Sequence, residues 1–279
     1  MARELFTVVG ARGFIGSALV ERLRGEGHDV RGVAHTDALP SPAGHVIYAS
    51  GIAAAAAPDV AYAYEVHVEG VRRIIAAGAA ASLLYISSTR VYGAAADTRE
   101  SAQLIVEPAA KDVYRVSKIA GEALCLAAEQ PAARVARLSN VIGPSFRSTL
   151  FMSDILRQAA TTGRIQVRTT RDSAKDYLAI DDACRYLIAI ALGGRERIYN
   201  VAFGANVENG AILDALARAS GAQVDIAAGA ARAVTAPVTA ERLHAEFGPA
   251  QTPILESLPE LYRAFAAHAW SDAPEAPRR

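Results

Sequence analysis

A glycine-rich turn between an apolar run and a helical pattern is the feature that most constrains how this chain can fold. Leu5–Val9 is a continuous run of apolar and β-branched residues, as expected of a fully buried strand. The turn GARGFIG follows at 10–16, and apolar residues then recur at helical spacing up to Leu23. In such a unit, glycines permit a tight turn, the close approach of a pyrophosphate and close packing of the helix on the sheet. The sequence therefore predicts an α/β fold that begins with a phosphate-binding turn.

The spacing of the three glycines is GxxGxxG rather than the more common GxGxxG. The spacing alone is a weak signal, and its place between a strand and a helix supplies the context that the motif requires. Because a helix N-terminus presents unpaired amides to an anion, we expect the turn and the first helical residues to bind a dinucleotide. The predicted contacts are Gly10, Arg12, Gly13, Phe14, Ile15 and Gly16. The alternative is a plain turn that binds nothing.

The rest of the first half alternates short apolar runs with amphipathic stretches, and the pattern loosens after about Asn140. Strands are expected at 30–34, 46–48, 83–86, 135–138 and 198–202, and helices at 62–77, 114–128, 154–161 and 181–192. This alternation predicts a doubly wound parallel sheet with helices on both faces. We assign 1–141 plus 176–203 to this domain, and 142–175 plus 204–270 to a small discontinuous lobe that selects the substrate. The tail at 271–279 carries prolines without an apolar period, and we expect it to be flexible.

Composition and charge exclude several classes of protein. Lys and Arg number 29 and so do Asp and Glu, which argues against a nucleic-acid partner that needs a basic surface. No apolar stretch is long enough to span a membrane, and Glu4 interrupts any secretion signal. Two cysteines cannot form a disulfide framework, and the six histidines lack metal-ligand spacing. We therefore expect a cytoplasmic protein without a membrane partner or a metal site.

The end of the second expected strand bears on the choice of dinucleotide. An acid usually stands there to hold the adenosine ribose hydroxyls. Here the strand ends in His35 and Thr36, and the first acid, Asp37, comes about one turn too late. The guanidinium of Arg12 lies in the glycine turn, where its fork can meet a 2′-phosphate. Both features favour NADP over NAD. The alternative interpretations are a solvated loop arginine and a surface histidine.

A tyrosine and a lysine stand four residues apart in the expected helix at 114–128. Tyr114 and Lys118 therefore share one helical face. A phenol has a reference pKa of about 10, and a neighbouring ammonium lowers it toward the range of a useful acid or base. Ser87 and Ser88 follow the strand at 83–86, and parallel sheets bind ligands at such carboxyl ends. The alternative for the helix is an amphipathic surface without chemistry.

Taken in order, these segments resemble the extended short-chain dehydrogenase/reductase superfamily, of the NAD-dependent epimerase/dehydratase type that acts on nucleotide sugars. The resemblance covers nearly the whole chain. It runs through GARGFIG at Gly10, SSTRVYG at Ser87, YRVSKIAGE at Tyr114, RLSNVIGP at Arg137, KDYLAIDDA at Lys175 and YNVA at Tyr199. It implies a Rossmann-type fold, an NADP or NAD cofactor, a nucleotide-sugar substrate and a homodimer built on the two long helices near 62–80 and 114–129.

The resemblance also implies roles for individual residues. Ser88 is the expected catalytic hydroxyl, Tyr114 the general acid/base and Lys118 its partner. Further cofactor contacts are expected from His35, Ala49, Ser50, Gly51, Ser87, Tyr114 and Lys118. Substrate contacts are expected from Ser88, Thr89, Arg90, Asn140 and Lys175.

Several positions depart from the family's pattern. His67 stands where an asparagine is usual, and its imidazole either replaces that structural amide or caps the helix. Lys175 replaces an arginine that contacts the substrate diphosphate, and a lysine lacks the bidentate fork. Thr89 and Arg90 stand where dehydratases carry Asp-Glu, and Arg90 also takes the place of the cysteine of fucose-synthase-like epimerases. Both substitutions count against those two chemistries.

The implied reaction is hydride transfer between nicotinamide and a sugar carbon. Because NADP suits net reduction, the first expectation is a nucleotide-sugar ketoreductase. The alternative is a 4-epimerase that keeps NAD tightly bound. A third interpretation is a non-catalytic dinucleotide-binding regulator, and the presence of Ser88, Tyr114 and Lys118 argues against it.

Overall fold

The computed structural model describes residues 2–52, 59–107, 109, 112–129 and 131–270. The chain divides into two compact units. The first comprises Met1–Val141, Lys175–Asn206 and Thr235–Thr252, and the second comprises Ile142–Ala174, Val207–Val234 and Pro253–Arg279.

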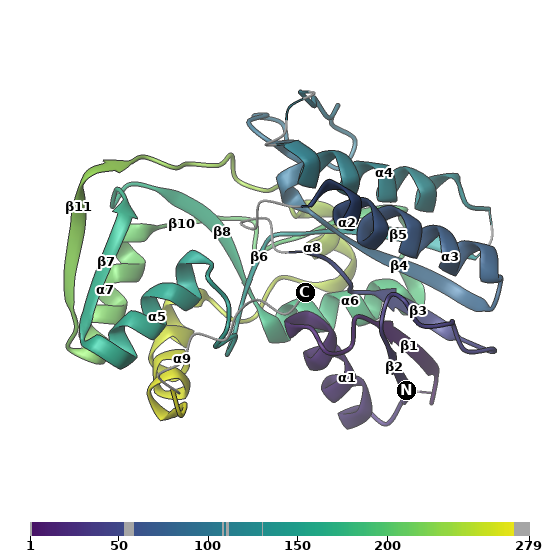
Figure 1. The fold of residues 1–279 in the computed structure, drawn as a ribbon, viewed down its shortest axis with the longest axis horizontal. Helices are drawn as coiled ribbons and strands as arrows, with labels where there is room; N and C mark the ends of the chain where they lie inside the picture. The colour runs from purple at the N-terminus through teal and green to yellow at the C-terminus, as the bar shows by residue number, and fades with distance from the viewer. Residues whose placement is uncertain (1, 53–58, 108, 110–111, 130, 271–279) are drawn as a thin grey trace. The chain divides into compact units, whose positions relative to one another are not determined.

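A six-stranded parallel sheet forms the centre of the first unit (Figure 1). Its order is β2-β1-β3-β4-β5-β9, and the predicted fold class is confirmed. The strands are β1 (Leu5–Val9), β2 (Asp29–Val33), β3 (Gly44–Tyr48), β4 (Ala80–Ser88), β5 (Ala132–Leu138) and β9 (Ile198–Val201). The order reverses between β1 and β3, and ligands of open α/β sheets bind outside the carboxyl ends of the strands at such a switch point.

Helices cover both faces of this sheet (Figure 1). On one face α1 (Phe14–Gly25) and α6 (Ile180–Gly193) form a core with β1, β3 and β4 that includes the buried Leu19, Leu23 and Tyr186. On the other, α3 (Gly70–Ala77) and α4 (Val113–Ala127) pack on β4 and β5. A strand between two such cores is apolar along its whole length, which explains the continuous run at 5–9.

The helix expected at 62–77 is interrupted. It consists of α2 (Val60–Tyr64), a π-helical turn η1 (Glu65–Glu69) and then α3. Tyr48 packs against this turn, and its hydroxyl donates to the carbonyl oxygen of Val66 at 2.6 Å. A Cβ on Gly70 would lie 2.0 Å from the Tyr48 hydroxyl, so glycine is required for this approach. The spacing of apolar residues cannot predict this π-helical turn, because the turn's contact with Tyr48 comes from a distant strand.

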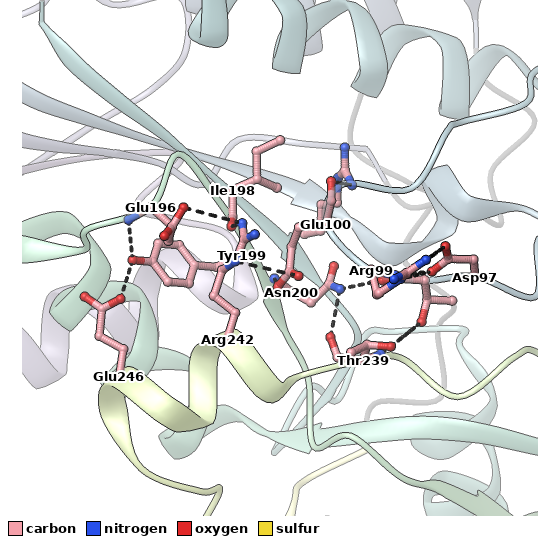
Figure 2. A network of polar contacts seen from close by, with 12 residues as sticks. Asp97, Arg99, Glu100, Glu196, Ile198, Tyr199, Asn200, Thr239, Arg242 and Glu246 are labelled. Carbon is pink, nitrogen blue, oxygen red and sulfur yellow. Dashed lines mark hydrogen bonds and ion pairs between the residues drawn. The ribbon is translucent and has the colours of Figure 1, made fainter.

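Residues 235–252, which the sequence placed in the substrate lobe, belong to the first unit. Figure 2 shows the contacts that hold them there. The side-chain amide of Asn200 donates to the carbonyl oxygens of Thr98 and Thr239, at 2.7 and 2.8 Å. On α8 (Glu241–Phe247), Arg242 donates to the carbonyl oxygen of Ile198, and Glu246 accepts from the Tyr199 hydroxyl. These are polar contacts to residues of β9. The sequence of 235–252 contains no local pattern that predicts them.

The second unit contains α5 (Phe151–Thr162), α7 (Asn209–Ser220) and α9 (Ile254–Ala267), with β7 (Arg164–Thr169) parallel to β11 (Gln223–Ala231). A further small sheet, most of whose residues belong to the first unit, has the order β10-β8-β6, formed by Asn206–Glu208, Ala174–Ala179 and Asn140–Ile142. No helix in the described part of the chain is long and apolar enough to cross a membrane.

Candidate active site

The glycine turn is tightly constrained at its first and third glycines. Gly10 has a φ of +85°, and its N–H donates to the carbonyl oxygen of Val33 at 2.8 Å. A Cβ on Gly10 would lie 2.7 Å from the backbone nitrogen of Ser50, and one on Gly16 would lie 2.1 Å from the oxygen of Gly10. The turn therefore packs against the segment that follows β3, and the start of α1 packs against the turn. Substitution at either glycine would force these backbones apart.

The N-terminus of α1 is open to an anion. Gly13 is the N-cap, it makes no side-chain capping hydrogen bond, and the first turn carries no acidic residue. Phe14 and Ile15 therefore open a helix whose end carries partial positive charge. Such an end suits an anion, and a pyrophosphate contact from these residues stays a prediction.

Three residues bear on the choice of dinucleotide: Asp37 and His35, which follow β2, and Arg12 in the glycine turn. Asp37 accepts the N–H of Ala34 at 2.7 Å and returns a backbone bond to it, so its side chain closes a local turn. Arg12 is exposed. His35 lies edge-on to Tyr62, and burial lowers its pKa, so the imidazole stays uncharged at neutral pH. A contact of Arg12 with a 2′-phosphate stays a prediction.

Ser88 and Tyr114 come together at the carboxyl end of β4. Ser88 is the last residue of that strand and Tyr114 lies in the first turn of α4. Burial raises the pKa of Tyr114, while the nearby Ser88 side chain and the charge of Arg90 oppose that rise. The phenol is therefore a neutral proton donor at physiological pH.

Lys118 lies one helical turn further along α4 and is fully buried. Its Nζ donates to the carbonyl oxygen of Ile86 at 2.9 Å and lies 5.0 Å from the centroid of the Tyr85 ring. Burial lowers its pKa to about 7. We expected Lys118 to lower the pKa of Tyr114, but the cation that acts on the phenol in this structure is Arg90. A carbonyl oxygen holds the ammonium instead, a contact that residue spacing does not reveal.

The segment after β3 connects the glycine turn to Lys118. Ala49 donates its N–H to the oxygen of Val9, and Ser50 contacts Gly10 as described. A Cβ on Gly51 would lie 3.4 Å from the Nζ of Lys118. Three of the predicted cofactor residues, Ala49, Ser50 and Gly51, therefore run from the turn to the catalytic helix.

Ser87 is hydrogen-bonded to a buried ion pair, Glu122 with Arg137, that was not predicted from the sequence. Its hydroxyl donates to Glu122 at 2.5 Å, and Glu122 in turn accepts three hydrogen bonds from Arg137. Both charged side chains are 4% exposed. Ser87 thus anchors the end of β4, and a contact to the cofactor stays a prediction for it. In the sequence, the signal for this contact is the position of Glu122, eight residues after Tyr114 in the same expected helix.

The predicted substrate residues are less closely grouped. The Asn140 amide donates to the carbonyl oxygen of Asp176 at 2.8 Å. Lys175 is partly buried, which lowers its pKa, and the charge of Arg90 lowers it further. Thr89 donates to the oxygen of Leu138 at 3.5 Å. Arg90 is exposed and its charge acts on both Tyr114 and Lys175.

Within the described residues, no group of three or more His, Cys, Asp or Glu side chains is placed to hold a metal ion.

Comparison with known proteins identifies the family. The model of the NAD dependent epimerase/dehydratase family matches residues 6–50 and 38–202, more than half of the chain. The chain therefore belongs to this family, as the resemblance in its motifs predicted.

Individual relatives agree with the family. The GDP-6-deoxy-D-mannose reductase of Pseudomonas aeruginosa is 30% identical over 167 residues, which are 56% of this chain and 55% of that protein. The match thus spans about half the length of that relative. RMD from Pseudomonas aeruginosa, solved with NADPH, has a TM-score of 0.77 at 24% identity and covers 94% of this chain and 99% of its own. TunA, an NAD-dependent NDP-hexosamine 5,6-dehydratase, has a TM-score of 0.81 at 18% identity, with 95% and 98% covered. At these identities the two structures establish the fold.

Proposed function

We propose that this protein is an NAD(P)-dependent reductase of a nucleotide-linked keto sugar. The observation that carries the proposal is the pairing of Ser88 with Tyr114 near the carboxyl end of β4, where the Ser88 side chain acts on the pKa of the phenol, one helical turn from the buried Lys118. The same edge of the sheet carries the glycine turn, connected to Lys118 through Ser50 and Gly51. A regulator that only binds a dinucleotide has no need of such a pair.

The three side chains have distinct tasks in the proposed reaction. A bound nicotinamide dinucleotide would supply the hydride. Ser88 holds the carbonyl oxygen of the sugar, and Tyr114 gives its proton to the alkoxide that develops there. The charge of Arg90 favours the phenolate left behind, and Lys118 would bind ribose hydroxyls of the cofactor. Because the pKa of Tyr114 is raised, the phenol stands ready in its protonated form, which suits reduction more than oxidation.

The choice of reaction rests on residues beside the catalytic pair. Thr89 and Arg90 follow Ser88, so the acidic pair that the dehydratases of the superfamily carry there is replaced. The relative with 30% identity is a reductase, and the related RMD structure contains NADPH. A 4-epimerase is the second candidate, because the family includes epimerases and because the same phenol can also remove a proton from a sugar hydroxyl.

Cofactor stoichiometry separates these functions. The purified protein is incubated with UDP-, GDP- and dTDP-linked hexoses and their 4-keto forms, with and without added NADPH. We expect oxidation of one NADPH for each keto sugar reduced, and no interconversion of sugars in its absence. Interconversion without added cofactor, by protein that carries nicotinamide as purified, would instead establish the epimerase. Binding without turnover over the whole panel would contradict both.

Arg12 is expected to select NADP. Since a guanidinium can pair with a phosphate through charge-assisted hydrogen bonds, Arg12→Ala should weaken NADPH binding by about 10- to 100-fold and leave NADH binding nearly unchanged. Fluorescence titration of both cofactors measures the ratio. Arg24→Ala, which removes an exposed cation from the last turn of α1, the helix that follows the glycine turn, is the matched control. Equal losses for the two cofactors would remove the assignment.

Homodimerisation stays a prediction. Apolar side chains exposed on α2, namely Val60, Tyr62 and Tyr64, and Leu126 on α4 support it.

A further inference from the structure

A buried histidine connects the segment after β3 to the helix that carries Tyr114. His67 lies in the π-helical turn η1 and is fully buried. Its ring stands edge-on to the ring of Tyr114, with centroids 5.5 Å apart and planes at 88°. The mechanism above gives this side chain no task.

The hydrogen bonds of His67 fix its tautomer. The backbone N–H of Ile52 points to Nε2 at 3.3 Å, and because a backbone N–H can only donate, Nε2 must be the acceptor. The ring proton therefore lies on Nδ1, which faces the hydroxyl oxygen of Ser117 at 2.9 Å. The hydroxyl of Ser117 in turn donates to the carbonyl oxygen of Tyr114 at 3.0 Å. Three hydrogen bonds thus run in one direction from Ile52 to the backbone of Tyr114.

The surroundings of the ring favour its neutral form. Burial, and then the charge of Lys118, lower the pKa of His67 to about 2. A Cβ on Gly51 would lie 3.4 Å from the Nζ of Lys118 and 3.6 Å from Nε2 of His67, so the ammonium and the ring border the same glycine. A neutral ring can accept from Ile52 without repelling Lys118.

We propose that His67 is a positioning residue, which as its Nδ1–H tautomer sets the distance between the cofactor-binding segment at 49–52 and the catalytic turn of α4. This inference rests on the proposed function. In this proposal, the geometry of the site depends partly on a side chain that touches neither substrate nor cofactor. A shift of about 1 Å in a reacting group can cost about 100-fold in rate, so such a spacer has a measurable effect.

Substitutions can separate positioning from packing. His67→Leu removes both hydrogen bonds, whereas His67→Gln keeps an acceptor and a donor on one side chain. His45 provides a matched control, because its Nδ1 also lies 2.8 Å from a serine hydroxyl, that of Ser82, but at the amino ends of β3 and β4. We expect His67→Leu to weaken NADPH binding about tenfold, with His67→Gln recovering most of the loss and His45→Leu within twofold of the wild type. Turnover on the keto sugar identified by the panel should fall about 10- to 100-fold in His67→Leu at an almost unchanged KM.

The failure of this inference differs from the failure of the proposed function. Nitrogen chemical shifts of the wild-type imidazoles report the tautomer without any turnover, and we expect protonated Nδ1 and unprotonated Nε2 for His67. Protonated Nε2 would overturn the inference, as would a His67→Gln that binds NADPH no better than His67→Leu. A Tyr114→Phe variant that retains turnover would overturn the proposed function and leave the tautomer standing.

Discussion

Tyr114→Phe is expected to lower kcat by about 100- to 10,000-fold, the range that a positioned acid or base contributes. The change removes one oxygen, that of the phenol, and leaves an aromatic ring to pack edge-on against His67. Because the pKa of Tyr114 is raised by burial, the lost group is a protonated phenol over the whole neutral range. The measurement is single-turnover oxidation of NADPH with saturating keto sugar.

The control for this variant is cofactor affinity. Lys118 binds the oxygen of Ile86 and not the phenol, so its position should survive the change, and the NADPH dissociation constant should stay within about threefold. Ser88→Ala tests the partner hydroxyl and should lower kcat by a smaller factor, since it supplies a hydrogen bond and no proton. Turnover at the wild-type rate in Tyr114→Phe would remove the assignment of the general acid.

Arg137→Met should lower the free energy of unfolding by about 3–5 kcal/mol, because it leaves a buried carboxylate without its counter-charge. The guanidinium of Arg137 reaches Glu122 at 2.7 to 3.2 Å, and its other nitrogen donates to the Tyr92 hydroxyl at 2.9 Å. With Arg137 gone, Glu122 keeps the hydroxyl of Ser87 as its partner. Urea denaturation followed by circular dichroism measures the loss.

Two further variants provide controls for the stability loss expected of Arg137→Met. Adding Glu122→Leu to Arg137→Met should recover much of the loss, since neither charge of the pair is left. Arg164→Met breaks a pair with Asp225 in which the side chains are 67% and 51% exposed, and should leave the unfolding midpoint almost unchanged. If Arg137→Met proves no more harmful than Arg164→Met, the buried pair does not hold α4 to β5.

The sequence predicts most of the central sheet, because its signals are local. An apolar run predicts β1, the glycine spacing predicts the turn that follows, and an amphipathic pattern predicts α1. None of these signals requires knowledge of the rest of the chain. The encounter of Ser88 with Tyr114 is also predictable, since the carboxyl ends of parallel strands share one edge of a sheet.

What the sequence does not predict depends on contacts between distant residues. The π-helical turn at Glu65–Glu69 depends on Tyr48, and the place of residues 235–252 depends on Asn200. The direction of the Lys118 ammonium depends on the oxygen of Ile86. Short strands such as β7, with the sequence RIQVRT, alternate polar and apolar residues too briefly to stand out from a loop.

The position of β2 at the border of the central sheet has a consequence for solubility. A border strand presents unpaired backbone groups that invite another chain to add a strand and begin aggregation. Asp29 and Arg31 place opposite charges along β2, with Asp29 paired to Arg3 and Arg31 bonded to the carbonyl oxygen of Pro42. A foreign strand docking there would have to strip water from these ions. The charges therefore protect the protein from self-association in a crowded solution.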